Sequence, residues 1–145
     1  MSAVNVAVDL KGPLGRALRR FERKGRAAAE VMPVVADTLV AAVLETFEQQ
    51  GPGWPALAPS TVKARRAQGA GAKILQDTGV LAGSIQPSTG TGAYGPWAAA
   101  GTNIHYGAFH VTGTSRMPRR DFLDVDLRAI AREAAELILL EVGRP

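Results

Sequence analysis

The side chains of this sequence that could act as nucleophile, base or acid are few and lie in the middle of the chain. A serine hydrolase would use Ser60 or Ser84 as its nucleophile. Its base would be His105 or His110, and Asp77 would orient that base. No serine stands in a G-x-S-x-G stretch, the turn that exposes such a nucleophile at the top of a sheet. We therefore expect no enzymatic activity from these residues.

Asp77, Thr78 and Gly79 form the three-letter signature of a retroviral-type aspartic protease, in which one Asp from each of two subunits shares a proton. The string alone is short, and the apolar residues around it, such as Leu75 and Leu81, are typical of an amphipathic turn. We expect Asp77 or Thr78 to cap a single helical turn that extends through Leu81. This favours a structural role over proteolysis.

The sequence offers no set of metal or cofactor ligands. It contains no cysteine, which excludes thiolate sites and disulfides. His105 and His110 are five residues apart and do not match the i, i+4 pair of a helical metal site. The glycines at Gly90, Gly92 and Gly101 lack the Lys-Ser/Thr of a phosphate-binding loop. We expect neither a metal nor a cofactor.

The composition is that of a single globular domain over residues 1–145. Hydrophobic residues make up 46% and charged residues 21%, the ordinary balance of a folded protein, and the length is sufficient for one core. No basic patch followed by an apolar run opens the chain, and no apolar stretch reaches the roughly 20 residues of a spanning helix. We expect a protein made in the cytoplasm, without a membrane partner.

The net charge of +4 conceals blocks of opposite sign. Residues 11–26 carry seven basic groups and one acidic group, and residues 60–120 carry seven basic groups and one acidic group. Residues 27–59 carry four acidic groups and no basic one, and residues 121–145 carry six acidic and three basic groups. Such blocks suit subunits that pack against copies of themselves, or a surface that faces DNA; the alternative is an ordinary solvated, arginine-rich surface. The candidates for a DNA channel or interface in the first block are Arg16, Arg19, Arg20, Arg23, Lys24 and Arg26.

The expected fold class is α+β, with a small antiparallel sheet packed against two helices. Alternating apolar residues predict a strand over residues 4–10. Residues 84–88 and 93–102 are candidate strands of a central hairpin whose turn lies at residues 89–92. A proline in each arm favours edge or bulged strands.

The helices are predicted from apolar residues at helical spacing. One covers residues 14 to about 24, and a firmer one covers residues 35–50, with a break or kink between them at Gly25 and Pro33. The strongest pattern covers residues 127–142.

Two features mark the ends of this last helix. Asp124 or Asp126 can cap its start. Leu139 and Leu140 widen its apolar stripe almost all the way round, so we expect the sheet or another subunit to cover that end.

Four short phrases follow one another in the middle of the chain, and in this order they resemble the virion morphogenesis, or tail-completion, proteins of Mu-like and related tailed bacteriophages. A W-x-x-L-x-P phrase comes first, then D-T-G-x-L-x-x-S, then G-T-N-x-x-Y-x-x-x-H, and finally P-x-R-x-F-L. The residues at these positions are Trp54, Leu57, Pro59, Asp77, Thr78, Gly79, Leu81, Ser84, Gly101, Thr102, Asn103, Tyr106, His110, Pro118, Arg120, Phe122 and Leu123. We interpret them as scaffolding for turns and core contacts, with G-T-N as a tight turn where positive φ is tolerated.

The resemblance implies a non-enzymatic structural protein of a phage or prophage particle, located in the virion at the neck or tail. Such proteins act where the tail is closed or joined to the head, and the expected assembly is a hexameric ring around the DNA channel. The implied partners are copies of the chain itself, neighbouring connector, adaptor or tail-tube proteins, and packaged DNA through non-specific contacts. Two alternatives remain: a free DNA-binding protein that uses the basic N-terminal segment, and a transient assembly factor that leaves before maturation.

Overall fold

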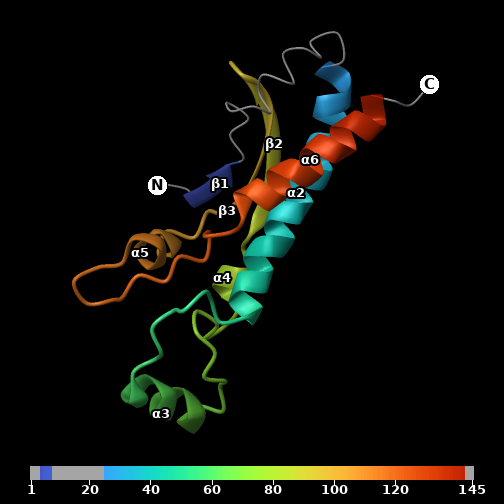
Figure 1. Cartoon of the computed structure of the whole chain (residues 1–145). Helices are drawn as coiled ribbons and strands as arrows, with labels where there is room; N and C mark the ends of the chain where they lie inside the picture. The colour runs from blue at the N-terminus through green and yellow to red at the C-terminus, as the bar shows by residue number, and fades with distance from the viewer. Residues whose placement is uncertain (1–3, 8–24, 143–145) are drawn as a thin grey trace. The chain divides into compact units, whose positions relative to one another are not determined.

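The computed structural model describes residues 4–7 and 25–142, and it confirms the α+β class with a long helix, a central antiparallel hairpin packed on it and a C-terminal helix (Figure 1). The predicted helix over residues 14–24 and most of the basic N-terminal block lie outside the described residues. The elements in chain order are β1 (Val4–Ala7), α2 (Gly25–Glu48), α3 (Pro59–Ala67), α4 (Val80–Gly83), β2 (Gln86–Gly92), β3 (Gly95–Thr102), α5 (Gly107–Thr112) and α6 (Leu127–Val142).

The described residues divide into two compact units. The cavity unit contains Ala42–Gln86 and Gly101–Val125. The hairpin unit contains residues 25–41, Pro87–Ala100 and residues 126–142.

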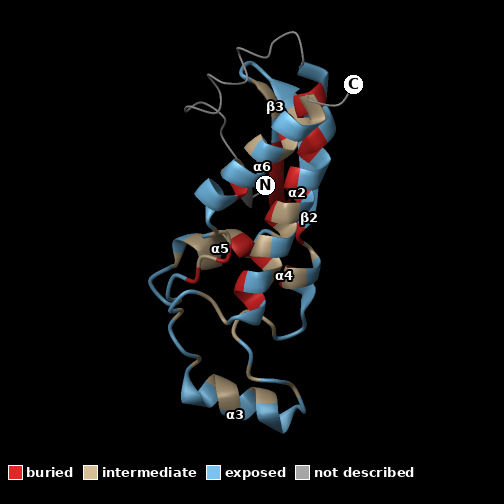
Figure 2. Ribbon diagram, turned by 45° about the vertical axis from the view of Figure 1, so that its right-hand side comes forward, coloured by how far each residue is buried: buried red, intermediate tan, exposed pale blue. Residues whose placement is uncertain are grey.

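The long helix α2 begins at Gly25, one of the two predicted break positions, and continues without a break through Pro33, so the predicted helix start at residue 35 was wrong. Pro33 lies inside the helix, on its exposed side. A proline there removes one backbone hydrogen bond, but the freed carbonyl at residue 29 belongs to an exposed residue and can be hydrated. The buried stripe of α2 includes Val35, Ala36 and Leu39 (Figure 2).

By length and composition α2 is long and apolar enough to cross a membrane, contrary to the prediction that no apolar stretch reaches that length. Its apolar stripe is nevertheless buried within the protein, while Asp37, Glu45 and Glu48 lie on exposed positions. A helix with one buried stripe and one charged face is the ordinary pattern of a helix that packs against a core.

The sheet has the strand order β1-β3-β2. Of the strand predicted over residues 4–10, the structure describes residues 4–7, which pair beside β3, whereas residues 8–10 lie outside the described part. In β3 the consecutive residues Ala98, Ala99 and Ala100 are all buried, so both faces of this strand are covered. The buried partners available in the hairpin unit come from α2 and from Ile130, Ala134 and Ile138 of α6.

The hairpin turn lies later than predicted, at residues 93–94, because the glycine-rich stretch 89–92 belongs to β2. Trp97 of β3 explains the error. A Cβ atom on Gly90 would lie 2.5 Å from Trp97 Cζ2, and one on Gly92 would lie 3.7 Å from Trp97 Cδ1. Glycine therefore serves here to admit a cross-strand indole ring rather than to make a turn.

Helix α6 has the bounds that the sequence predicts. Asp126 caps it, because its Oδ1 atom accepts 3.0 Å hydrogen bonds from the backbone N–H groups of Arg128 and Ala129. The described residues do not cover the C-terminal end of α6, where the sequence led us to expect a covering element. Leu139 is 55% exposed and Leu140 is 70% exposed.

The core of the cavity unit is built around two fully buried aromatic rings. Phe47, near the end of α2, and Phe122 have ring centroids 5.3 Å apart. Trp54 meets Phe47 edge-on at 6.1 Å. The close fit of Trp54 requires Gly51, where φ is +76° and a Cβ atom would lie 2.0 Å from the indole. This core fixes the segments that surround the cavity described next.

Candidate functional site

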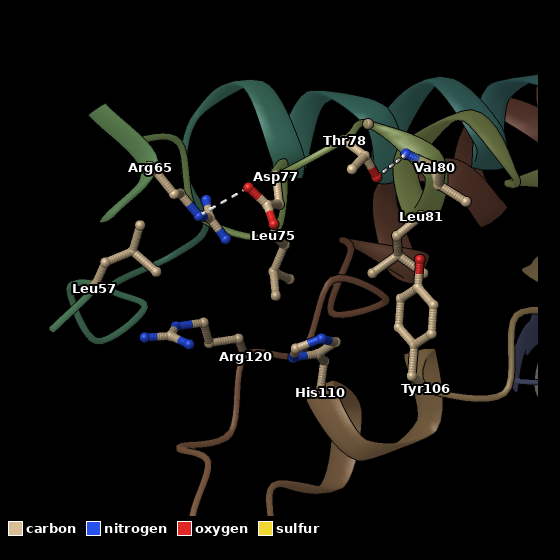
Figure 3. A pocket seen from close by; sticks show the side chains of 11 residues that line it. Leu57, Arg65, Leu75, Asp77, Thr78, Val80, Leu81, Tyr106, His110 and Arg120 are labelled. Carbon is tan, nitrogen blue, oxygen red and sulfur yellow. Dashed lines mark hydrogen bonds and ion pairs between the residues drawn. The ribbon is translucent and has the colours of Figure 1, made fainter. Parts of the chain in front are cut away.

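The cavity unit contains an open cavity of about 260 Å³ (Figure 3). Five segments surround it: the loop before α3, α3 itself, the loop into α4 with that helix, α5 with the residue before it, and the segment after the α5 loop. The lining residues are Leu57, Arg65, Leu75, Asp77, Thr78, Gly79, Val80, Leu81, Tyr106, His110 and Arg120.

Most of the polar lining comes from the four phrases noted in the sequence. Eight of the residues named there lie on this one cavity, namely Leu57, Asp77, Thr78, Gly79, Leu81, Tyr106, His110 and Arg120. From the sequence, these residues were predicted to serve separate turns and core contacts. No sequence pattern indicates that the four phrases meet, and Arg65 and Leu75, which lie among them, were not among the predicted site residues.

Arg120 is the most buried charged group of the cavity, with 8% of its surface exposed. Its Nε atom donates a 2.9 Å hydrogen bond to the Pro55 carbonyl, and its Nη2 atom donates a 3.0 Å bond to the Ala56 carbonyl. Its backbone N–H donates to the His110 carbonyl at 2.8 Å. Burial, and then the charge of Arg65, lower the pKa of Arg120 from its ordinary value. Within residues 25–142 no carboxylate forms an ion pair with Arg120.

Arg65 and Asp77 form the one ion pair found on the cavity lining. Arg65 Nε lies 3.2 Å from Asp77 Oδ1, and Arg65 Nη1 donates a 2.7 Å hydrogen bond to the Lys73 carbonyl. The predicted single helical turn is present as α4, but no side chain caps it, because the cap position is occupied by Gly79 with φ +75°. Of the two predicted caps, Asp77 pairs with Arg65, whereas the Thr78 hydroxyl accepts a long 3.5 Å hydrogen bond from the Val80 N–H.

His110 lies on α5 with its Nδ1 atom buried and without a hydrogen-bond partner in the described structure. Tyr106, one turn earlier, meets the imidazole edge-on at a centroid distance of 6.3 Å. Burial lowers the pKa of His110 from its ordinary value of 6.5, and the positive charge of Arg120 lowers it further by a smaller amount. The lowered pKa favours the neutral form of the imidazole.

Thr102, Ser84 and Gly107 form the packed layer behind Leu81. The hydroxyls of Ser84 and Thr102 are 2.6 Å apart, and Thr102 Oγ1 also accepts a 3.0 Å bond from the Ile104 N–H. A Cβ atom on Gly107 would lie 3.3 Å from Leu81 Cδ1, so α5 approaches α4 closely.

Gly101 and Thr102 end β3, and Gly101 has no positive φ, so the predicted tight turn at G-T-N was wrong.

The hydrolase constellation is not brought together. Ser84 bonds to Thr102 and to the Leu81 carbonyl, and Asp77 pairs with Arg65 rather than with a histidine. Ser60 and His105 are exposed and do not line the cavity. In the parts of the chain that the structure describes, no group of three or more His, Asp or Glu side chains could hold a metal ion.

The remaining motif residues have packing or local backbone roles. Pro59 is the first residue of α3, where its missing N–H costs nothing. Leu123 donates its backbone N–H to Asp121 Oδ1 at 3.0 Å, while Pro118 and Asn103 are exposed. Of the six basic candidates in the N-terminal block, only Arg26 lies among the described residues, and it is exposed on α2.

The chain belongs to the phage virion morphogenesis family, whose sequence model matches residues 10–139. Among curated proteins and solved structures there is no significant match. Family membership establishes a role in phage virion morphogenesis, indicates association with the virion and is consistent with a protein that is not an enzyme.

Proposed function

We propose that this protein is a non-enzymatic structural component that forms a ring at the head–tail junction or at the tail end of a phage particle. The observation that carries the proposal is the family match, which extends over almost the whole chain. A ring subunit uses heterologous contacts, in which one patch meets a different patch of its neighbour. Charge blocks of opposite sign along the sequence suit such contacts.

An exposed apolar patch in the hairpin unit supports assembly. Val34 of α2 is 51% exposed, and with Leu137 and Leu140 of α6 it lines a shallow groove. Leu139 and Leu140 add further exposed apolar surface at the end of α6. Neighbouring exposed apolar side chains such as these are typical of surfaces that another protein covers.

The proposal is tested by its place in the particle and by its dependence on the apolar patch. Mass spectrometry of purified virions should detect the chain, and electron microscopy should place it at the neck or tail end. Leu139→Glu together with Leu140→Glu should abolish the oligomer in native mass spectrometry without lowering Tm, because both side chains are already exposed. Glu133→Gln, an exposed polar position on the same helix, is the matched control and should leave the oligomer intact. Absence from particles whose heads and tails remain joined would refute the proposal.

A second candidate, non-specific DNA binding, is favoured by the excess of six positive charges over residues 11–26. Phosphate contacts of this kind weaken steeply with salt. A gel-shift series should therefore show binding at about 50 mM salt that is lost at about 200 mM. No shift at the lower concentration would dismiss it. A chain present during assembly but missing from mature particles would instead identify a transient assembly factor.

A further inference from the structure

The cavity unit holds an excess of positive charge around its opening. Arg120 is buried there without an acidic partner in the described structure, and Arg65 is the second cation. The only carboxylate on the lining, Asp77, is already paired with Arg65. A buried charge without a counter-charge is costly, and an incoming anion would remove that cost.

Figure 3 shows Arg120, His110 and Tyr106 along one side of the opening, with Arg65, Asp77 and Thr78 on the other. Two hydrogen-bonding groups of the first side are incompletely used. The Nδ1 atom of His110 has no partner, and the Arg120 fork presents five N–H donors, of which the described bonds to Pro55 and Ala56 use two. Leu57 and Leu75 provide apolar walls beside these two groups.

We propose that this cavity binds a carboxylate, and that the carboxylate is an acidic side chain of a second copy of this chain. A guanidinium fork matches the planar, two-oxygen geometry of a carboxylate, and Leu57 and Leu75 on the lining offer apolar contacts to the methylene groups of an acidic side chain. The inference rests on the proposed function, because it makes the cavity one of the two patches of a heterologous subunit contact.

Charge complementarity identifies the other patch as the acidic face of α2. Residues 27–59 contain four acidic groups and no basic group, and Glu45 and Glu48 are exposed one turn apart on that helix. Glu45 accepts a 2.7 Å hydrogen bond from Gln49, which holds its carboxylate on the surface. On α6, by contrast, Glu133 and Glu136 alternate with Arg128 and Arg132. The face of α2 is therefore the stronger complement to the cavity.

The carboxylate assignment is tested first with acetate alone on the full chain. Proton–nitrogen NMR of the imidazoles should show His110 signals that shift and saturate with sodium acetate, beyond the shifts caused by sodium chloride at equal ionic strength. Absence of any acetate-specific shift at His110 would overturn the assignment. Sodium phosphate that shifts His110 at lower concentration than acetate would also overturn it, in favour of a phosphate site.

The assignment of the carboxylate to a second copy of the chain is tested by disulfide trapping. No native thiol interferes, because the chain has no cysteine. Thr78→Cys places a thiol on the exposed edge of the cavity, and Glu48→Cys places one on α2. Mixing the two single variants under mild oxidation should give a covalent heterodimer at least tenfold faster than mixing Thr78→Cys with Glu133→Cys. Equal rates, or no heterodimer in either mixture, would overturn the second-copy assignment.

Native mass spectrometry of the wild-type chain distinguishes failure of the proposed function from failure of the cavity inference. A ring that forms without the Thr78–Glu48 heterodimer leaves the proposed function standing and overturns this inference alone. A chain that forms neither a ring nor the heterodimer overturns both. A heterodimer together with acetate-specific shifts at His110 supports both assignments.

Discussion

Replacing Arg120 by lysine should destabilise the protein at least as much as replacing it by methionine, although lysine keeps the charge. The Arg120 fork joins two carbonyls, those of Pro55 and Ala56, to a segment more than 60 residues later in the chain. A lysine ammonium is a strongly hydrated point charge that cannot occupy both donor positions, yet its burial cost remains. Methionine loses the same two bonds but removes that burial cost.

The size of the effect follows from the two bonds and from where their acceptors lie. A hydrogen bond to a charged group contributes about 1.5 to 3 kcal/mol, so two contribute up to about 6 kcal/mol. Pro55 and Ala56 are exposed residues, so water can satisfy part of what their carbonyls lose. We therefore expect a loss of about 2 to 4 kcal/mol for Arg120→Lys and a loss no larger for Arg120→Met.

The assay is urea unfolding followed by circular dichroism, with Tm as a second measure. In a chain of this length, Tm should fall by roughly 3 to 4 °C for each kcal/mol lost. Arg119 provides the control, because it is an adjacent arginine whose side chain is 66% exposed. It pairs with Asp121 at 2.8 Å and donates a 3.0 Å hydrogen bond to the Val111 carbonyl. Arg119→Met should cost less than about 1 kcal/mol. If Arg120→Lys kept wild-type stability while Arg120→Met lost several kcal/mol, the charge rather than the fork would be the stabilising feature, and the reasoning would be wrong.

Three further predictions concern the core, the hairpin and the pH dependence. Phe122→Ala removes a fully buried ring that packs on Phe47 and should lower the free energy of unfolding by about 3 to 5 kcal/mol, measured in urea; a loss below about 1 kcal/mol would contradict the described core. Gly90→Ala places a Cβ atom 2.5 Å from the Trp97 ring and should cost about 1 to 3 kcal/mol with a red shift of tryptophan emission, whereas an unchanged spectrum would show that the ring does not lie over Gly90. Because the pKa of His110 is lowered in the folded protein, the unfolded chain binds the proton more tightly, so stability falls as the pH drops below about 6.5; His110→Gln should flatten this part of the stability curve between about pH 7 and pH 5, and an unchanged slope would refute the assignment.

Local patterns predicted the elements whose signals lie within a single turn or helix. The bounds of α6 and its cap at Asp126 follow from apolar spacing and one carboxylate. The charged and buried faces of α2 follow from the same period, but its passage through Pro33 does not, because the tolerance of a proline depends on whether the freed carbonyl faces solvent. The hairpin was predicted with its turn misplaced, because nothing local shows that Gly90 lies under an indole seven residues later.

The candidate site was predicted as a set of residues but not as a site. The order of the four phrases identifies the family, and the charge blocks are visible without any structure. That Leu57, Asp77, His110 and Arg120 surround one cavity is decided by the tertiary structure alone. A side chain's type is a local property, whereas the distance between two side chains depends on how the whole intervening chain folds back. Arg120 beside the carbonyls of residues 55 and 56 is the clearest case, because only the packed core brings these segments within hydrogen-bond reach.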